Sequence, residues 1–226
     1  MKYQTEEKAM NGLRSIVRYP ESFDANERYP AVLFLHGAGT VGNDIEKLKS
    51  NVFWRHAENN AIPCVFFAPQ CDTGTVWFDN FEKLTAMAKT IAALSFIDPT
   101  RIYLIGTSMG GYGAWQLAMS LNKLFAAVIP VCGGGMYWNA ARLKSMPVWA
   151  FHGELDNVVS CDESRKMVDA INRRGGHAKL TTYPTREHNA WDDTYSNPEV
   201  WHWLLSQKRA DATADKGETF DGKKFG

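Results

Sequence analysis

The sequence lacks long apolar segments and an excess of charge of either sign. Its apolar runs, such as residues 31–35, are far shorter than the roughly 20 residues that cross a bilayer. The 226 residues carry 25 Lys and Arg against 25 Asp and Glu, so the formal net charge is zero. A neutral chain has no overall field that would draw it to nucleic acid or to an anionic membrane. We therefore expect neither as a partner.

The N-terminus also lacks the apolar segment of a secretory signal. Residues 1–10, MKYQTEEKAM, are mostly polar. This favours either a cytoplasmic protein or a domain excised from a secreted enzyme, and the sequence does not choose between them. Oligomeric state is left open in the same way.

Cysteine is scarce. Cys64, Cys71, Cys132 and Cys161 are too few and too scattered for a disulfide framework, and no pair has CxxC spacing. Cys64 and Cys132 lie in or beside apolar runs, which favours buried thiols. A bridge between Cys64 and Cys71 stays open if the protein is exported.

The motifs of metal and nucleotide sites are missing too. No histidine pair has i,i+4 spacing with a neighbouring glutamate, so we expect no metal. The glycines at 133–135 follow a strand-like run but lack the spacing of phosphate-binding loops. We therefore expect no cofactor of either kind.

What the sequence does contain is a regular alternation of strand-like and helix-like segments. Hydrophobic residues make up 45% and charged residues 22%, which is ordinary for a globular domain. Alternating segments indicate βαβ units, and hence an α/β fold with a mostly parallel sheet covered by helices on both faces. The expected strands are residues 13–19, 31–35, 64–68, 101–106, 126–131, 147–153 and 178–184. The expected helices are residues 44–59, 81–96, 110–121, 160–174 and 198–206.

This pattern has no linker and no internal repeat. It predicts one α/β domain over residues 1–207. Residues 208–226 lose the apolar periodicity, which predicts a polar, flexible tail.

The strongest chemical signal is Gly-Thr-Ser-Met-Gly at residues 106–110. It follows the apolar strand 101–106 and precedes a helix. A GxSxG motif between a strand and a helix is a nucleophile elbow, in which a strained turn exposes the serine. The sequence therefore predicts Ser108 as a nucleophile.

A serine nucleophile needs a base, and the base needs an acid that orients it. In this fold the chain order is serine, then acid, then histidine. Asp156 follows the expected strand 147–153, at the end of the sheet where active sites assemble. We predict Asp156 as the acid and keep Glu154 in reserve.

The base should follow the last strand. His188 lies in the loop after residues 178–184, at the correct end of the sheet. His177 precedes that strand, and His202 falls inside the last helix between two tryptophans. We predict His188 as the general base.

Acyl transfer also needs N–H donors for the oxyanion. One is expected from Met109, the residue after the nucleophile. The other is expected from Ala38 in His-Gly-Ala-Gly at residues 36–39, where small residues allow close approach, with Gly37 as the alternative.

Several blocks between residues 12 and 206 resemble α/β-hydrolase esterases of the polyhydroxybutyrate-depolymerase-like and feruloyl-esterase-like group, which includes prolyl-oligopeptidase-like "predicted peptidases". The blocks are LFLHGAGTVGND, FFAPQCDTGTVW, DPTRIYLIGTSMGGYGAWQLA, VCGGG, AFHGELDNVV and EHNAW. The resemblance implies Ser108, Asp156 and His188 as a triad. It also implies that Gln70 and Trp77 approach the pocket.

Aromatic residues indicate where the substrate is expected to bind. We expect Trp77, Tyr137, Trp138 and Trp191 to bind substrate at the rim, where they suit an aryl or sugar ring. About fifteen residues lie between Val131 and Pro147, too few for a large lid.

These observations predict a serine carboxylesterase that needs no cofactor. Its substrate would be a small-molecule or polysaccharide-linked ester with a short or aromatic acyl group, of acetyl or feruloyl type. The same machinery would serve a peptidase of prolyl-oligopeptidase-like type or a short-chain lipase. A non-catalytic binding module is the remaining alternative.

Overall fold

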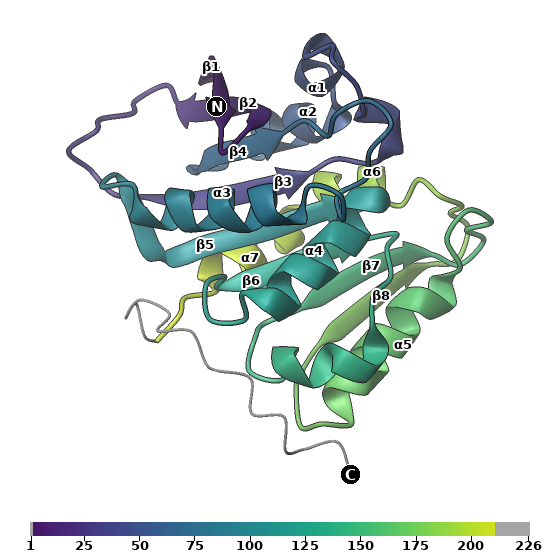
Figure 1. Cartoon of the computed structure of the whole chain (residues 1–226). Coiled ribbons are helices and arrows are strands. Elements are labelled where there is room, and N and C mark those ends of the chain that lie inside the picture. The colour runs from purple at the N-terminus through teal and green to yellow at the C-terminus, as the bar shows by residue number, and fades with distance from the viewer. Residues whose placement is uncertain (1, 211–226) are drawn as a thin grey trace.

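A computed structural model of the chain describes residues 2–210, and in that part eight strands form one sheet. The strands are β1 (Tyr3–Met10), β2 (Leu13–Pro20), β3 (Tyr29–Leu35), β4 (Val65–Pro69), β5 (Ile97–Thr107), β6 (Ala127–Val131), β7 (Trp149–Gly153) and β8 (Lys179–Tyr183). Their order across the sheet is β1-β2-β4-β3-β5-β6-β7-β8 (Figure 1). The β1–β2 and β2–β4 pairs are antiparallel, and the other neighbours are parallel.

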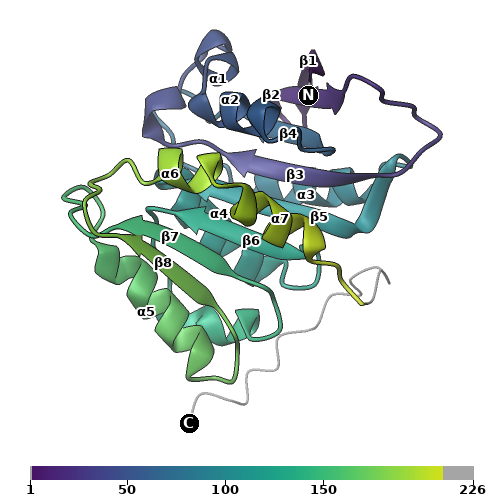
Figure 2. The same ribbon diagram turned by 180° about the vertical axis from the view of Figure 1, so that it is seen from behind.

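Helices cover both faces of the sheet. They are α1 (Glu46–Lys49), α2 (Val52–Asn59), α3 (Phe81–Ala93), α4 (Met109–Ser120), α5 (Cys161–Asn172), α6 (Trp191–Ser196) and α7 (Pro198–Ser206), with 3₁₀ turns η1 (Ala38–Thr40) and η2 (Tyr137–Leu143). Figure 1 shows α3, α4 and α5 in front of the sheet, and Figure 2 shows α6 and α7 on the opposite face. The predicted α/β architecture is therefore confirmed.

The central strand β3 illustrates why the sheet forms. Leu33 and Leu35 pack with α3 and α4, whereas Val32 and Phe34 pack with α2 and α7 in a second apolar cluster. Successive side chains of a strand point to opposite faces, so a continuous apolar run suits a strand that is buried on both. This packing fixes the central strands whose ends carry the site.

Three elements differ from the sequence-based expectation. The polar strand β1 was not predicted, and neither was α6. Residues 44–59 form two helices instead of one, because Asn51 ends the first turn and caps α2 by accepting a hydrogen bond from the Phe53 N–H at 3.0 Å.

The remaining structural expectations concern cysteines, the lid, the tail and the membrane. All four cysteines are buried and free, so Cys64 and Cys71 are not bridged. The segment between β6 and β7 holds only the short η2.

Most of the predicted tail, from residue 211 onward, lies outside the described residues. None of the helices found in residues 2–210 is long and apolar enough to cross a membrane.

Candidate active site

Ser108 occupies a sharp turn between β5 and α4. Its backbone has φ 55° and ψ −117°, which is strained for a residue with a side chain. The Ser108 N–H donates to the Val131 carbonyl at 2.8 Å, which holds the turn against β6. A Cβ on Gly110 would collide with the Leu35 carbonyl, so only glycine lets α4 start this close to β3. The local sequence thus builds the predicted elbow.

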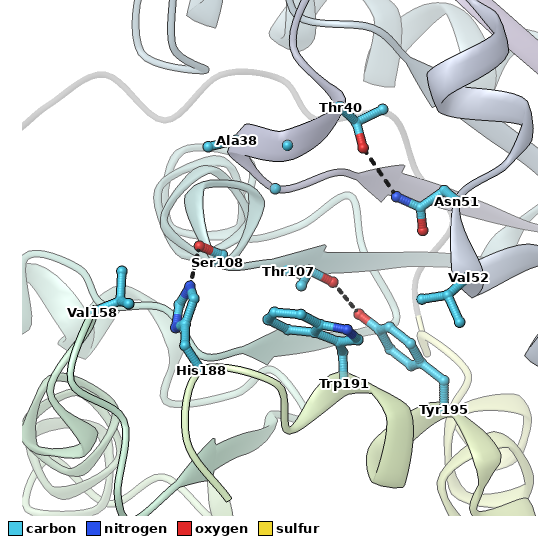
Figure 3. Close-up of a pocket in the computed structure, with 12 residues that line it drawn as sticks. Ala38, Thr40, Asn51, Val52, Thr107, Ser108, Val158, His188, Trp191 and Tyr195 are labelled. Atoms are coloured by element: carbon cyan, nitrogen blue, oxygen red, sulfur yellow. Dashed lines mark hydrogen bonds between the residues drawn. The ribbon is translucent and has the colours of Figure 1, made fainter.

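The elbow brings Ser108 to the two residues predicted to act with it. The Oγ of Ser108 lies 2.7 Å from Nε2 of His188 (Figure 3). Nδ1 of His188 lies 2.7 Å from Oδ2 of Asp156. A carboxylate accepts only, so Nδ1 carries the proton and Nε2 is free to accept from Ser108. This order of donors and acceptors is the one that a serine nucleophile requires.

Two loops at the carboxyl edge of the sheet carry the acid and the histidine. Asp156 follows β7, and His188 follows β8. Their loops touch directly, because the Leu155 N–H donates to the Arg186 carbonyl at 3.0 Å. A Cβ on Gly153 would collide with the carbonyls of Arg186 and Glu187, so this close packing depends on glycine. The two loops therefore hold the Asp156–His188 contact.

The Asp156 carboxylate is buried and accepts several hydrogen bonds. Its Oδ1 accepts from the N–H groups of Val158 at 3.0 Å and Val159 at 2.8 Å. Burial alone would raise the pKa of Asp156, but the hydrogen bonds from His188 and from these two amides outweigh it and lower that pKa. Asp156 is therefore ionised at neutral pH and can stabilise an imidazolium.

The alternatives to these residues lie elsewhere. Glu154 is exposed, and its Oε1 accepts from the Thr182 hydroxyl at 2.7 Å. His177 and His202 are exposed and do not line the cavity beside Ser108. None of the three is placed to replace Asp156 or His188.

A cavity of about 380 Å³ opens beside Ser108 and His188. Trp191 forms one wall, with its ring edge-on to His188 at a centroid distance of 5.5 Å. Two hydrogen-bonded pairs line the rest (Figure 3): Thr107 Oγ1 lies 2.6 Å from the Tyr195 hydroxyl, and the Asn51 amide donates to Thr40 Oγ1 at 3.2 Å. The cavity is therefore apolar along its length with a few fixed polar groups.

Sequence reasoning missed four of these lining residues. Thr40, Asn51, Thr107 and Tyr195 come from different elements that only the folded sheet brings together. Thr107 lies inside the elbow motif, but nothing in the motif assigns it to a cavity wall. Asn51 is indicated in the sequence only as a helix cap.

The loop after β3 places Ala38 at the cavity and the N-terminus of α4 beside it. Ala38 begins η1 and lines the cavity, and Met109 begins α4 immediately after Ser108. The Gly37 carbonyl lies 2.7 Å from Nδ1 of His36, which is fully buried. Since the Gly37–Ala38 peptide is trans, its N–H points away from that carbonyl. The His36 contact thus fixes the orientation of the Gly37–Ala38 peptide, next to the cavity that Ala38 lines.

The protonation of His36 is fixed by its surroundings. Nε2 accepts from the Cys71 N–H at 3.0 Å, so the single ring proton is on Nδ1 and donates to the Gly37 carbonyl. Burial lowers the pKa of His36 to about 4, with the Gly37 bond opposing that shift. The ring is therefore neutral near pH 7.

Gln70 and Trp77 support this loop instead of lining the cavity. The Trp77 indole N–H donates to the His36 carbonyl at 2.9 Å, and the Gln70 amide donates to the carbonyls of Thr40 at 3.1 Å and Asp44 at 2.6 Å. Both side chains are buried. Their expected approach to the pocket is thus indirect, through the loop they hold.

Tyr137 and Trp138 are also away from the cavity. They are exposed on η2 and border a separate depression together with Arg173 and Arg174, next to the C-terminal end of α5. Among the side chains expected to bind substrate, the structure brings only Trp191 to the cavity beside Ser108. The reason is that η2 runs back along α5, away from the elbow.

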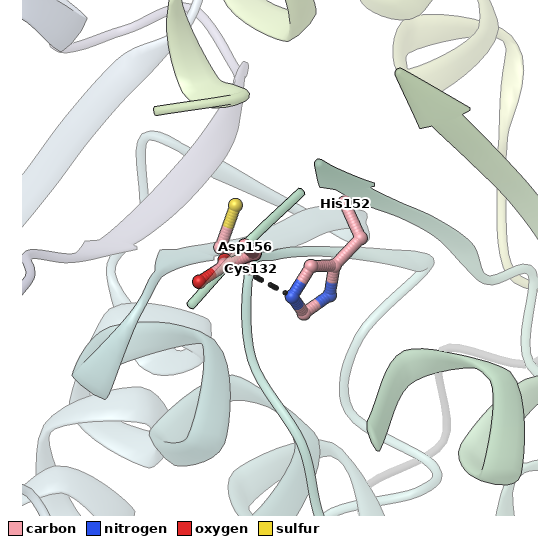
Figure 4. A group of neighbouring side chains, drawn as sticks. All are labelled: Cys132, His152 and Asp156. Carbon is pink, nitrogen blue, oxygen red and sulfur yellow. Dashed lines mark ion pairs between the residues drawn. The ribbon is translucent and has the colours of Figure 1, made fainter. Parts of the chain in front are cut away.

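A second group of polar side chains surrounds the acid. The Cys132 Sγ, a ring nitrogen of His152 and an oxygen of Asp156 all lie within 4.8 Å of one another, and all three residues are buried (Figure 4). Such a trio has the donor types of a metal site. In the structure, the Asp156 oxygens accept from the Val158 and Val159 amides and from His188, and Oδ2 lies 3.2 Å from Nε2 of His152.

The chain is similar in sequence to known hydrolases. The sequence profile of the dienelactone hydrolase family matches residues 73–216. The chain is 25% identical to a probable feruloyl esterase C from Aspergillus terreus, over 74% of this chain and 63% of that protein. It is 23% identical to dipeptidyl-peptidase 5 from Porphyromonas gingivalis, over 75% of this chain but only 32% of the peptidase.

A solved structure is similar as well. The crystal structure of a thermostable esterase superposes with a TM-score of 0.75 at 34% sequence identity, covering 92% of this chain and 63% of the esterase. The chain thus spans less than two thirds of each of these relatives. The fold is nevertheless common to this chain and the esterase.

Proposed function

This chain belongs to the dienelactone hydrolase family, and we propose that it is a serine carboxylesterase acting on short-chain or aromatic esters. The observation that carries the proposal is the hydrogen-bonded series Ser108–His188–Asp156 on a nucleophile elbow. The similarity to feruloyl esterases and to a thermostable esterase supports an ester as substrate.

In the proposed reaction, His188 takes the Ser108 proton while Oγ attacks the ester carbonyl carbon. The carbonyl oxygen becomes an oxyanion, which the N–H groups of Ala38 and Met109 stabilise. The tetrahedral intermediate collapses, the alcohol leaves with the proton from His188, and an acyl-enzyme remains. Water, activated by His188, then attacks the acyl group and releases the acid and free Ser108.

The cavity supports a short or aromatic acyl group. Trp191 offers a ring for stacking, and the hydroxyls of Thr107 and Tyr195 offer polar contacts within the same cavity. Within residues 2–210, no cap is inserted between β6 and β7, which suits a bulky alcohol such as a polysaccharide. One relative, a bifunctional acetylxylan esterase/xylanase from Neocallimastix patriciarum, is 24% identical over 70% of this chain.

A panel of chromogenic esters, combined with a fluorophosphonate probe for reactive serines, tests the proposal. We expect turnover of p-nitrophenyl acetate and methyl ferulate, and covalent labelling at Ser108 by peptide mapping. Labelling at another residue, or turnover that persists when Ser108 is fully labelled, would contradict it.

A serine peptidase is the second candidate, because the dipeptidyl-peptidase relatives share this region. The chain corresponds to only about a third of those proteins, so the comparison supports the common catalytic domain more than the reaction. Dipeptidyl p-nitroanilides run beside the ester panel distinguish the two. A higher kcat/KM for the anilides than for every ester would favour the peptidase.

A further inference from the structure

The acid of the proposed triad contacts two histidines, and the mechanism above uses only one. His152, the fourth residue of β7, is fully buried, and its Nε2 lies 3.2 Å from Oδ2 of Asp156 (Figure 4). The same oxygen accepts from Nδ1 of His188 at 2.7 Å. One carboxylate oxygen is therefore shared by the two imidazoles.

The neighbours of His152 fix where its proton is. Nε2 also lies 2.9 Å from the Val159 carbonyl, so it faces two acceptors and must carry a hydrogen. Burial lowers the pKa of His152, with the Val159 and Asp156 contacts opposing that shift. A neutral ring with hydrogen on Nε2 has a free lone pair on Nδ1.

That lone pair has a partner on α5. The Ser164 hydroxyl lies 2.8 Å from Nδ1 of His152 and is fully buried. Ser164 Oγ also lies 3.0 Å from the Gly133 carbonyl, in the loop after β6, so its single hydrogen is shared between that carbonyl and Nδ1. With both ring nitrogens engaged, the imidazole of His152 is held in one orientation, and its Nε2–H is shared between the Val159 carbonyl and Asp156 Oδ2.

We propose that His152 is a positioning residue that fixes the Asp156 carboxylate and sets the basicity of His188. Each hydrogen bond donated to Oδ2 offsets part of the negative charge of the carboxylate, which would otherwise stabilise a protonated His188. Removing the His152 donor should therefore strengthen the Asp156–His188 interaction and move the acidic limb of activity to higher pH. This inference rests on the proposed function, since it concerns the same triad.

The other titratable groups facing Asp156 do not change charge near neutral pH. They are Cys132 in the loop after β6, Cys161 on α5 and Tyr112 on α4. Burial raises the pKa of each, that of Cys132 to about 12. The charge changes that matter on the acidic side are thus those of Asp156 and the two imidazoles.

The test compares His152→Phe, which removes the donor, with His152→Gln, which keeps an N–H. The acidic midpoint of kcat/KM is measured for p-nitrophenyl acetate, and the protonation of His188 is followed by histidine-ring NMR. For His152→Phe we expect both midpoints to rise by roughly one pH unit, the scale of one hydrogen bond to a charged group. His152→Gln should return both toward the wild-type value.

Ser164→Ala provides a second route if His152→Phe folds poorly. It leaves the histidine but removes the partner of Nδ1, so we expect a smaller shift in the same direction. Tyr103→Phe is the matched control: it deletes a buried hydroxyl that donates to the Gln207 carbonyl at 2.9 Å, far from Asp156. It should lower the thermal midpoint without moving either pH midpoint.

Unchanged pH midpoints in folded His152→Phe and Ser164→Ala would overturn the inference. So would an equal shift in His152→Phe and His152→Gln, since the N–H would then be irrelevant. The NMR measurement needs no turnover. A shifted His188 titration in a protein without Ser108-dependent ester hydrolysis would therefore reject the proposed function while upholding the role of His152.

Discussion

The Oγ of Ser108 and Nε2 of His188 lie 2.7 Å apart, although 80 positions separate the two residues in the chain. The Ser108 N–H donates to the Val131 carbonyl at the end of β6, and the loop that carries His188 packs on the loop that carries Asp156. The contact is therefore formed by rigid elements before any substrate binds. This preorganisation is what a positioned base needs.

Ser108→Ala should abolish ester hydrolysis and leave the protein folded. The Ser108 hydroxyl contacts His188 in the described structure and packs little apolar surface, so its loss should cost little stability. Removing the nucleophile of a triad typically lowers kcat on the order of 10⁶-fold. Purified Ser108→Ala with a wild-type thermal midpoint but a tenth of the wild-type rate would refute the assignment.

Asp156→Asn should lower kcat by roughly 10⁴-fold, because an amide at this position favours the wrong tautomer of His188. Glu154→Gln serves as the control, since its side chain is exposed and contacts Thr182 and Arg165 instead of His188. We expect Glu154→Gln to retain nearly full activity. Reversed losses in the two variants would make Glu154 the acid.

The catalytic side of the site was predictable because it depends on local sequence and on a simple rule of topology. A GxSxG turn after an apolar strand needs only neighbouring residues, and parallel strands bring their carboxyl ends to one edge. That rule points to Asp156 and His188, and in the structure His188 contacts Ser108 and Asp156 contacts His188. The buried strands were predictable for the same reason, since each is a continuous apolar run.

The substrate side was not predictable in the same way. Resemblance placed Gln70 and Trp77 near the site, but it could not say that their side chains turn toward carbonyl groups of the loop after β3. Tyr195 lies on α6, a short helix without a clear apolar period. The strand β1 is polar and mostly exposed, so its pairing with β2 has no hydrophobic signal.

Trp77→Phe should lower kcat with little change in KM. The variant keeps a ring but removes the indole N–H that holds the His36 carbonyl, which loosens the loop that presents Ala38. Loss of about 1.4 kcal/mol of transition-state stabilisation corresponds to a roughly tenfold lower kcat. Trp54→Phe is the control, because its indole N–H donates to the Leu48 carbonyl at 2.7 Å on α2. Equal kcat for the two variants would mean that Trp77 has a purely structural role.

Acid should destabilise the fold partly through His36. Its pKa is about 4 in the folded chain against 6.5 for an unperturbed histidine, so between these values the unfolded chain binds a proton that the folded chain does not. The contribution of neutral His36 to the free energy of unfolding is complete above pH 6.5. It is lost as pH falls through this window, by up to about 3 kcal/mol. Urea unfolding at several pH values should show a smaller acid loss for His36→Asn than for wild type. Parallel losses would show that His36 is not buried and neutral.

Acyl-chain preference follows from the shape of the cavity. A volume of about 380 Å³ bounded by Trp191 and Tyr195 accommodates a short or aromatic acyl group, and no inserted cap extends it. Each methylene left in water forgoes about 0.8 kcal/mol of transfer free energy. We therefore expect kcat/KM for p-nitrophenyl esters to peak between acetyl and butyryl and to fall by decanoyl.

Methyl ferulate extends this prediction to aromatic acids, because a ring stacked on Trp191 gains roughly 0.5–1.5 kcal/mol beyond area burial. Trp191→Ala should therefore reduce kcat/KM for methyl ferulate more than for p-nitrophenyl acetate. Trp138→Ala is the control, since Trp138 lies outside the cavity on η2 and should leave the ratio of the two substrates unchanged. A chain-length profile that rises toward palmitate, without hydroxycinnamate turnover, would favour a lipase, because long acyl chains would then find apolar cover that this cavity does not supply.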